Sequence, residues 1–317
     1  MSLLIVSITH GDDTDGLTCA ALLYRLYKAK VVLANYDDLE QILADVASDV
    51  THLYITDLNL REALLPQIQR IRGHAAVTLI DHHPMREVVK TRLIELGVEV
   101  VHDTRDCASI LVYHHFRDKL EQNAVRIAAY AAIADMFEEG PIASIILDHM
   151  DRKFAQHEAL ILNHALGYDQ SEQFKRSIVT SLAAYSYPHQ IKEAPETALK
   201  QLERIVEMRR MVPEKTTRIG RLAYLECNSS FSTGEVANII MDTLGVDVGM
   251  CYKIEEDSVN VSLRGERRLV EHLGEILSKL SEKHGGFGGG HNRAAGAKIP
   301  KTKLQAFIMD LGKELNL

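Results

Sequence analysis

Short apolar stretches alternate with helix-like segments over the first third of the chain, and this alternation constrains the fold more than any other feature. The apolar stretches have strand length and cover residues 3–9, 31–36, 53–56, 76–80 and 98–101. Between them, apolar residues recur at helical spacing in residues 17–29, 39–46 and 61–71. Strands that are apolar throughout and separated by helices are typical of a parallel sheet covered on both faces. The sequence therefore predicts an α/β domain with a Rossmann-like parallel sheet.

A helical extension and a connecting helix are predicted to follow this sheet. Residues 108–185 show mostly helical periodicity, which Pro188 and Pro195 then interrupt. Residues 197–211 are predicted to form a linker helix that ends before Pro213, because proline lacks the amide hydrogen that a helix interior needs.

A second, smaller α/β domain is predicted after the linker, because its strand-like and helix-like segments mix again. These segments cover residues 222–225, 234–244, 248–254 and 259–263. A chain of 317 residues also exceeds the usual size of one domain. We therefore expect a first domain at 1–190, a linker helix at 191–213 and a second domain at 214–317, with the active site in the cleft between the domains.

The net charge of −8 belongs entirely to the front part, because residues 213–317 contain 14 Lys and Arg and 14 Asp and Glu. An acidic first domain favours cation binding and disfavours a long nucleic-acid track, so an anionic substrate should be short. Ordinary variation in surface charge would explain the same count. With no apolar run of ~18 residues and no signal-like start, the sequence predicts a cytoplasmic protein without a membrane partner.

The four cysteines are Cys19, Cys107, Cys227 and Cys251, which lie far apart in the sequence with no C-x-x-C pair. This spacing favours neither a zinc site nor a disulfide framework. We expect reduced, partly buried thiols.

Side chains of the types that bind metals follow three of the predicted strands. The tripeptide 81–83, Asp-His-His, ends the stretch 76–80, the segment 10–16 contains a histidine and three aspartates after the first strand, and Asp57 follows the stretch 53–56. Asp135 ends a helical segment. Because the carboxyl ends of parallel strands share one edge of a sheet, these side chains should converge, and multivalent cations would relieve their repulsion.

Each of these residues also has a structural interpretation. Asp15 and Asp57 could cap the helices that follow them, Asp135 could be a solvated helix residue, and the polar tripeptide could be an exposed turn. Taken together, the residues favour a metal cluster.

These residues resemble the motifs of the DHH phosphoesterase superfamily, and the match spans nearly the whole chain. His10 with Asp13-Thr14-Asp15-Gly16 resembles its first motif, Asp57 its second, Asp81-His82-His83 its third and Asp135 its fourth. The string 288–296, Gly-Gly-Gly-His-Asn-Arg-Ala-Ala-Gly, is similar to the GGGH signature of the DHH-associated C-terminal domain. In size and arrangement the chain is most similar to the two-domain nanoRNase and nucleotide-phosphatase branch.

The resemblance implies two divalent metal ions, most simply Mn²⁺, with Mg²⁺ or Co²⁺ as substitutes. One ion would be held by His10, Asp13 and Asp57, and the other by Asp15, His82 and Asp135, with Asp57 bridging both. His83 would orient water or a phosphate oxygen, or act as an outer support of the site, and Asp81 would be an outer support rather than a metal ligand.

One departure from the family pattern concerns the first motif. Asp12, Asp13 and Asp15 offer three carboxylates where the family needs two, and His10 lies one residue closer to Asp13 than in several relatives. Asp13 and Asp15 are the predicted ligands because they preserve the D-x-D-G form, which leaves Asp12 as an outer support.

The second domain is predicted to bind substrate. Gly288, Gly289 and Gly290 would let the backbone approach a phosphate or sugar, and His291 would add a donor, although a flexible turn explains the glycines as well. Arg264 resembles a family position and could grip a phosphate bidentately, with a surface arginine as the alternative. Arg293 is a weaker candidate for phosphate binding, because its side chain could point to solvent.

The resemblance therefore implies a metal-dependent phosphodiesterase that degrades short oligonucleotides to mononucleotides and also acts on 3′-phosphoadenosine-5′-phosphate. His83, Asp57 and Arg264 would carry the reaction. Two alternatives remain: a phosphodiesterase for cyclic dinucleotides or other small nucleotides, and a non-enzymatic nucleotide-binding regulator. A pyrophosphatase of the same superfamily would carry a different C-terminal domain.

Overall fold

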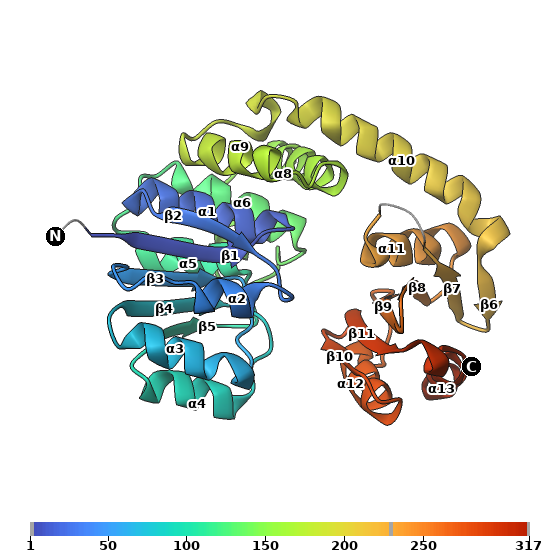
Figure 1. The fold of residues 1–317 in the computed structure, drawn as a ribbon. Helices are drawn as coiled ribbons and strands as arrows, with labels where there is room; N and C mark the ends of the chain where they lie inside the picture. Colours follow the sequence, from blue (N-terminus) through green and yellow to red (C-terminus); the bar gives the residue numbers. More distant parts are fainter. Residues whose placement is uncertain (1–2, 228–230, 316–317) are drawn as a thin grey trace. The chain divides into compact units, whose positions relative to one another are not determined.

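The computed structural model describes residues 3–227 and 231–315 and divides the chain into two compact units, Met1–Gln201 and Leu202–Leu317 (Figure 1). Among the described residues, no helix combines the length and apolar character needed to cross a membrane. All four cysteines are buried, and none of them forms a disulfide bond.

The first unit contains a five-stranded sheet in which every neighbouring pair is parallel. The strands are β1 (Ile5–His10), β2 (Lys30–Ala34), β3 (His52–Thr56), β4 (Ala76–Asp81) and β5 (Glu99–His102). Their order is β2-β1-β3-β4-β5, so the chain changes direction across the sheet between β1 and β3. The predicted α/β fold with a parallel sheet is confirmed, and its switch point is where such sheets bind ligands.

Helices cover both faces of this sheet, and each face has its own apolar core. On one face lie α2 (Leu39–Ala44), α3 (Leu65–Arg72), which follows the 3₁₀ turn Glu62–Leu64, and α4 (Glu87–Glu95). On the other face lie α1 (Thr14–Tyr27) and the helical extension. Leucines, isoleucines and valines of the strands fill both layers, which explains why the strands are apolar throughout.

The predicted helical extension is present, and most of its helices pack on α1. Its helices are α5 (Ala108–Phe116), α6 (Ala124–Ala134), α7 (Ala143–Asp148), α8 (Arg152–Tyr168) and α9 (Glu172–Ala183). A 3₁₀ turn, Pro188–Gln190, precedes the long helix α10.

Helix α10 (Ala194–Lys215) is longer than the predicted linker helix. The predicted end before Pro213 is wrong, since the helix continues through it. Pro195 lies in the first turn, where its missing N–H costs nothing, and Pro213 lies in the last turn, where only one hydrogen bond is lost.

The second unit contains a six-stranded mixed sheet in the order β10-β11-β9-β8-β7-β6. Its strands are β6 (Thr217–Ile219), β7 (Leu222–Glu226), β8 (Val248–Glu255), β9 (Ser258–Gly265), β10 (Phe287–Gly290) and β11 (Ala294–Pro300). Only β7 and β8 pair in parallel among the pairs described. Strands β10 and β11 were not predicted, because their glycines and alanines carry little apolar periodicity.

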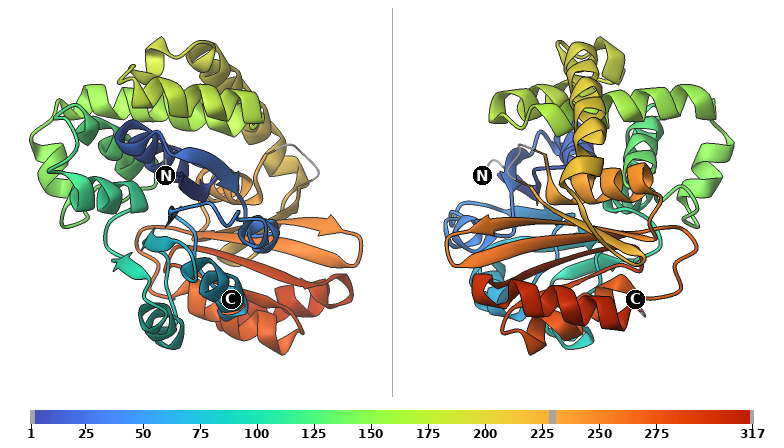
Figure 2. Two further views of the ribbon diagram at one scale, coloured as in Figure 1. Left: turned by 60° about the vertical axis from the view of Figure 1, so that its left-hand side comes forward. Right: turned by 90° about the vertical axis from the view of Figure 1, so that its right-hand side faces the viewer.

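Helices pack on both faces of the second sheet (Figure 2). One face packs on α12 (Leu273–Lys283) and α13 (Leu304–Glu314), the latter after the 3₁₀ turn Lys301–Lys303. The other face packs on α11 (Thr233–Leu244) and on buried residues of α10. The alternation of Leu222 with Ala223 and of Met250 with Cys251 between the two cores is the period-2 pattern of strands.

Candidate metal centre

The loop between β1 and α1 is built around a close backbone approach. Asp13 caps α1, with Oδ1 accepting a hydrogen bond from the Gly16 amide at 2.9 Å, and its Oδ2 lies 2.6 Å from His10 Nδ1. A Cβ on Gly16 would lie 2.0 Å from the carbonyl oxygen of His10. The glycine of the D-x-D-G form is therefore required by the tight contact between α1 and the end of β1.

Asp57 lies at the end of β3 and links two groups of side chains. Its carboxylate is 1% exposed, with Oδ1 3.3 Å from His82 Nε2 and Oδ2 3.7 Å from His10 Nδ1. Its backbone adopts the left-handed conformation, with φ of 56°. Oδ2 is buried and has no hydrogen-bond partner among the described residues, which is costly for a carboxylate unless a cation binds there.

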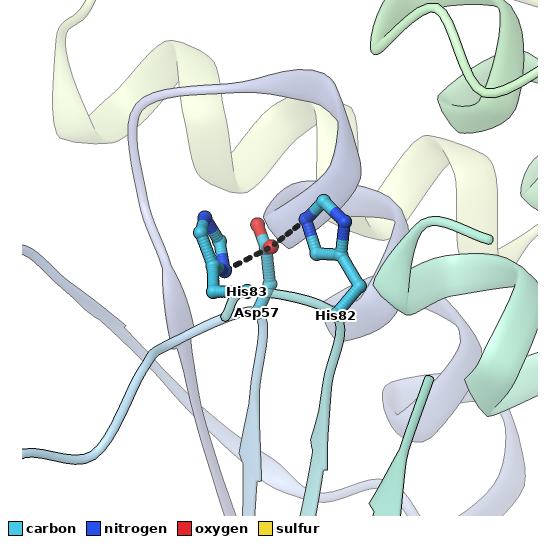
Figure 3. Close-up of side chains that lie close together, drawn as sticks. All are labelled: Asp57, His82 and His83. Atoms are coloured by element: carbon cyan, nitrogen blue, oxygen red, sulfur yellow. Dashed lines mark ion pairs between the residues drawn. The ribbon is translucent and has the colours of Figure 1, made fainter. Parts of the chain in front are cut away.

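The two histidines at the end of β4 lie on either side of Asp57, as Figure 3 shows. His82 is buried, and its Nε2 also lies 3.8 Å from Asp15 Oδ2 and 3.7 Å from Asp135 Oδ2. His83 Nδ1 lies 2.9 Å from Oδ1 of the fully buried Asp81 and 3.9 Å from Asp57 Oδ1. His82 therefore faces the carboxylates, while Asp81 holds the ring of His83.

Asp15 and Asp135 reach the same place from the helical layer. The two oxygens of Asp15 accept hydrogen bonds from the amides of Ala108 and Ser109 at 2.7 and 2.8 Å. Asp15 thus caps α5 and not α1, the helix for which the sequence suggested a cap, and each oxygen keeps a second lone pair for a metal. Asp135 ends α6 and is partly exposed.

The pKa shifts of these carboxylates and histidines show that bringing them together costs free energy. Burial, together with the charges of Asp13 and Asp15, raises the pKa of Asp57 well above its usual value, and the same causes raise the pKa of Asp135. Burial lowers the pKa of His10, but Asp13, Asp12 and Asp15 outweigh it and bring the pKa to about 8. The cluster therefore favours added positive charge.

Three sets of side chains in the described structure place their ligand atoms within 4.8 Å of one another. They are His10, Asp13 and Asp57; Asp15, His82 and Asp135; and Asp57, His82 and His83. All six predicted ligands belong to these sets, and Asp57 belongs to two of them. Mixed imidazole and carboxylate donors with a buried, unsatisfied carboxylate oxygen fit divalent cations.

The predicted substrate-binding residues of the second unit lie at one end of its sheet. Arg264 is at the end of β9 and half-buried, and burial lowers its pKa. Its Nη1 donates to the carbonyl of Leu263 at 2.9 Å, and its guanidinium packs against Gly234, in the first turn of α11. It is therefore not an ordinary surface arginine.

The three glycines Gly288, Gly289 and Gly290 lie in the edge strand β10, so the alternative of a flexible turn is wrong. A Cβ on Gly274 of α12 would lie 2.1 Å from the carbonyl oxygen of Gly290, and a Cβ on Gly288 would lie 2.8 Å from the Cβ of Ala297. Close packing of α12, β10 and β11 explains Gly274 and Gly288, whereas a Cβ on Gly289 would meet nothing within 4 Å. His291 follows the strand, and Arg293 is exposed.

Two residues that the sequence did not single out also lie near this centre. The ring of Tyr36 lies 6.0 Å from that of His10 and 6.3 Å from that of His83. It follows β2, so its position after a strand was a usable signal. Lys175 Nζ lies 2.7 Å from Asp12 Oδ1, a contact that no local pattern could reveal.

Two comparisons with known proteins give matches in sequence. Residues 223–316 match the DHHA1 domain model. An uncharacterized protein from Methanocaldococcus jannaschii is 36% identical over 97 residues, which cover 30% of this chain but only 21% of that protein.

Solved structures resemble nearly the whole chain. The DHH domain of a protein described as a member of a family of ribosomal proteins has a TM-score of 0.77 at 17% identity, covering 99% of this chain and 86% of that one. The pGpG-specific phosphodiesterase PggH from Vibrio cholerae has a TM-score of 0.57 at 13% identity, with 99% of both chains covered. RecJ from Thermus thermophilus in complex with Mn²⁺ has a TM-score of 0.61 at 16% identity and covers 98% of this chain and 52% of RecJ. Residues 223–316 therefore match a DHHA1 domain, and the chain as a whole has the fold of these DHH-domain, phosphodiesterase and RecJ structures.

Proposed function

We propose that the protein is a metal-dependent phosphohydrolase that cleaves the phosphodiester bonds of very short oligonucleotides and releases mononucleotides, with 3′-phosphoadenosine-5′-phosphate as a second substrate. The observation that carries this proposal is the convergence of six potential ligands on the carboxyl edge of the parallel sheet, with Asp57 shared by two sets. Phosphodiesterase and exonuclease activities among structures of the same fold support it.

His10, Asp13 and Asp57 would hold one ion, and Asp15, His82 and Asp135 would hold the other together with Asp57. When bound there, divalent ions would supply Lewis acidity, which lowers the pKa of water and offsets negative charge on a phosphate. The solved RecJ structures that contain Mn²⁺ or Mg²⁺ support these metals, and Mn²⁺ is our choice because of the mixed donor set.

The residues of the chain itself prepare the site for a phosphate. The hydrogen bond to Asp81 fixes the ring of His83 beside Asp57, so His83 can orient water or a phosphate oxygen. The N-terminus of α5 holds Asp15 by both oxygens, which fixes this carboxylate in place at a helix end that favours negative charge.

Arg264, Gly288, Gly289, Gly290 and His291 are proposed to bind a phosphate or sugar of the substrate. Replacing Arg264 by alanine should raise KM by about 10- to 100-fold, which corresponds to the ~1.5 to 3 kcal/mol of a charge-assisted hydrogen bond. Arg264→Lys should recover only part of the loss, because lysine lacks the planar fork. Steady-state kinetics with a dinucleotide in Mn²⁺ measures this, and the exposed Arg218→Ala of β6 is the matched control. An unchanged KM in a folded Arg264→Ala protein would exclude the role.

A substrate panel under one Mn²⁺ condition tests the function as a whole. It compares RNA dinucleotides, linear and cyclic diguanylates, 3′-phosphoadenosine-5′-phosphate, pyrophosphate and a long single strand. Dinucleotides should turn over far faster than long RNA. Preference for a diguanylate would favour the small-nucleotide phosphodiesterase, for which the resemblance to PggH is the supporting observation. Nucleotide binding without turnover across a panel of divalent metals would instead favour a regulator.

A further inference from the structure

The third carboxylate of the first motif, Asp12, makes contacts that the metal centre does not explain. It belongs to none of the three ligand sets in the described structure, and its side chain is 47% exposed. Lys175 Nζ lies 2.7 Å from its Oδ1 and comes from α9, 163 residues later in the chain. Lys175 itself is only 8% exposed. Burying an ammonium group costs free energy unless the group is paired, so the contact with Asp12 is part of what stabilises Lys175 at this position.

A second contact ties the backbone of Asp12 to the same helical layer. The side-chain amide of Gln170, between α8 and α9, donates to the carbonyl oxygen of Asp12 at 3.1 Å and to that of Leu166 at 2.7 Å. On the other side of the loop, the amide of Gly11 donates to the carbonyl of Ala34 in β2 at 2.9 Å. The loop is thus held between the sheet and the helical extension.

The segment 10–15, which comprises the loop with the last residue of β1 and the first two of α1, carries three of the six proposed ligands. Asp12 directly precedes Asp13, whose two oxygens contact the Gly16 amide and His10 Nδ1. A shift of Asp12 would therefore be passed to Asp13 and His10 at once. Helix α9 also packs against α1, so Lys175 reaches the loop from a rigid neighbour.

We propose that Lys175 is a positioning residue, which through Asp12 holds the loop 10–15 in the geometry that binds divalent metal. The inference rests on the proposed metal-dependent function. A purely electrostatic role would have the opposite sign: the ammonium repels a cation, so its removal would then strengthen metal binding. Positioning predicts that removal weakens it.

Calorimetric titration of the metal-free protein with Mn²⁺ separates these outcomes. Lys175→Met, which keeps the length of the side chain, should weaken Mn²⁺ binding by about 10- to 100-fold, the usual effect of removing a support behind a metal ligand. Lys175→Arg should recover part of the affinity, because it keeps the charge. Lys192→Met, at a lysine whose side chain is 87% exposed, is the matched control and should bind as the wild type does.

Asp12→Asn provides a second variant at an exposed position, where misfolding is not expected. It should weaken Mn²⁺ binding like Lys175→Met, and the double variant should be no weaker than either single one, because both remove one interaction. Unchanged or tighter Mn²⁺ binding by folded Lys175→Met and Asp12→Asn proteins would overturn the proposal. If the wild-type protein itself binds no Mn²⁺, the proposed metal centre is wrong and the positioning role falls with it. If the wild type and all variants bind Mn²⁺ equally well, the metal centre stands and only the positioning role is wrong.

Discussion

Replacing Asp57 by asparagine is expected to abolish the proposed activity while leaving the metal-free protein folded. The two carboxylate oxygens lie 3.7 Å from His10 Nδ1 and 3.3 Å from His82 Nε2, and these histidines belong to different proposed metal positions, so loss of the carboxylate removes charge from both. Metal contributes several kcal/mol to such reactions, so kcat should fall by at least about 10³-fold. Asparagine tolerates the left-handed backbone at this position, so little strain is added.

Without metal, the Asp57→Asn variant should have a slightly higher melting temperature than the wild type. Burial and the neighbouring Asp13 and Asp15 raise the pKa of Asp57, so its charge opposes folding. A carboxyl whose pKa is raised on folding destabilises the protein above its unfolded pKa of about 4, and the cost grows as pH rises toward the folded value. The gain in melting temperature should therefore be present at pH 7 and vanish below about pH 4.

Thermal melts with and without Mn²⁺ check both effects. Mn²⁺ should raise the melting temperature of the wild type but not that of Asp57→Asn. Asp45→Asn, at an exposed carboxylate beyond α2, is the control and should behave as the wild type in activity and melting. Full activity of Asp57→Asn would contradict the shared role of this carboxylate.

Replacing Gly16 by alanine is expected to be the most damaging single-methyl change in the first unit. The added Cβ would lie 2.0 Å from the carbonyl oxygen and 2.7 Å from the carbonyl carbon of His10, both of them backbone atoms. Helix α1 would have to move away from β1, at a cost of about 3 kcal/mol or more. In a unit of this size the melting temperature should fall by roughly 6 to 12 °C.

The same change should remove Mn²⁺ binding, because the loop from His10 to Asp15 would be displaced. Gly296→Ala is the control: its Cβ would meet only the carbonyl oxygen of Val261, at the ordinary contact distance of 3.7 Å. Calorimetric melts and Mn²⁺ titrations of both variants give the comparison. A Gly16→Ala protein with wild-type stability and Mn²⁺ affinity would show that helix and strand do not meet as closely as described.

Much of the first unit was predictable from local patterns. Strand β4 and the tripeptide that ends it were predicted together. A short stretch in which every residue is apolar is typical of a strand buried on both faces, and the polar residues after it mark where the strand ends. The parallel arrangement followed from the intervening helices. Since parallel strands share a carboxyl edge, the convergence of His10, Asp57 and His82 could be predicted without knowledge of the tertiary contacts.

Local patterns failed where packing outweighed intrinsic preference. Helix α10 runs through Pro213 because a proline in a last turn costs little. Strand β10 contains Gly288 and Gly290 at positions where neighbouring atoms leave no room for a Cβ. The end of the linker helix and the presence of the glycine-rich strand therefore depended on tertiary packing and could not be predicted from local patterns.

Sequence alone was enough for the α/β alternation and for the candidate ligands, because both depend on residues that are close along the chain. The capping of α5 by Asp15 and the pairing of Lys175 with Asp12 were decided only in the folded chain. Each joins groups more than 90 residues apart, with separations of 93 and 163. Such contacts leave no period in the sequence, since they arise only when the helical extension packs against α1 and brings its side chains to the loop.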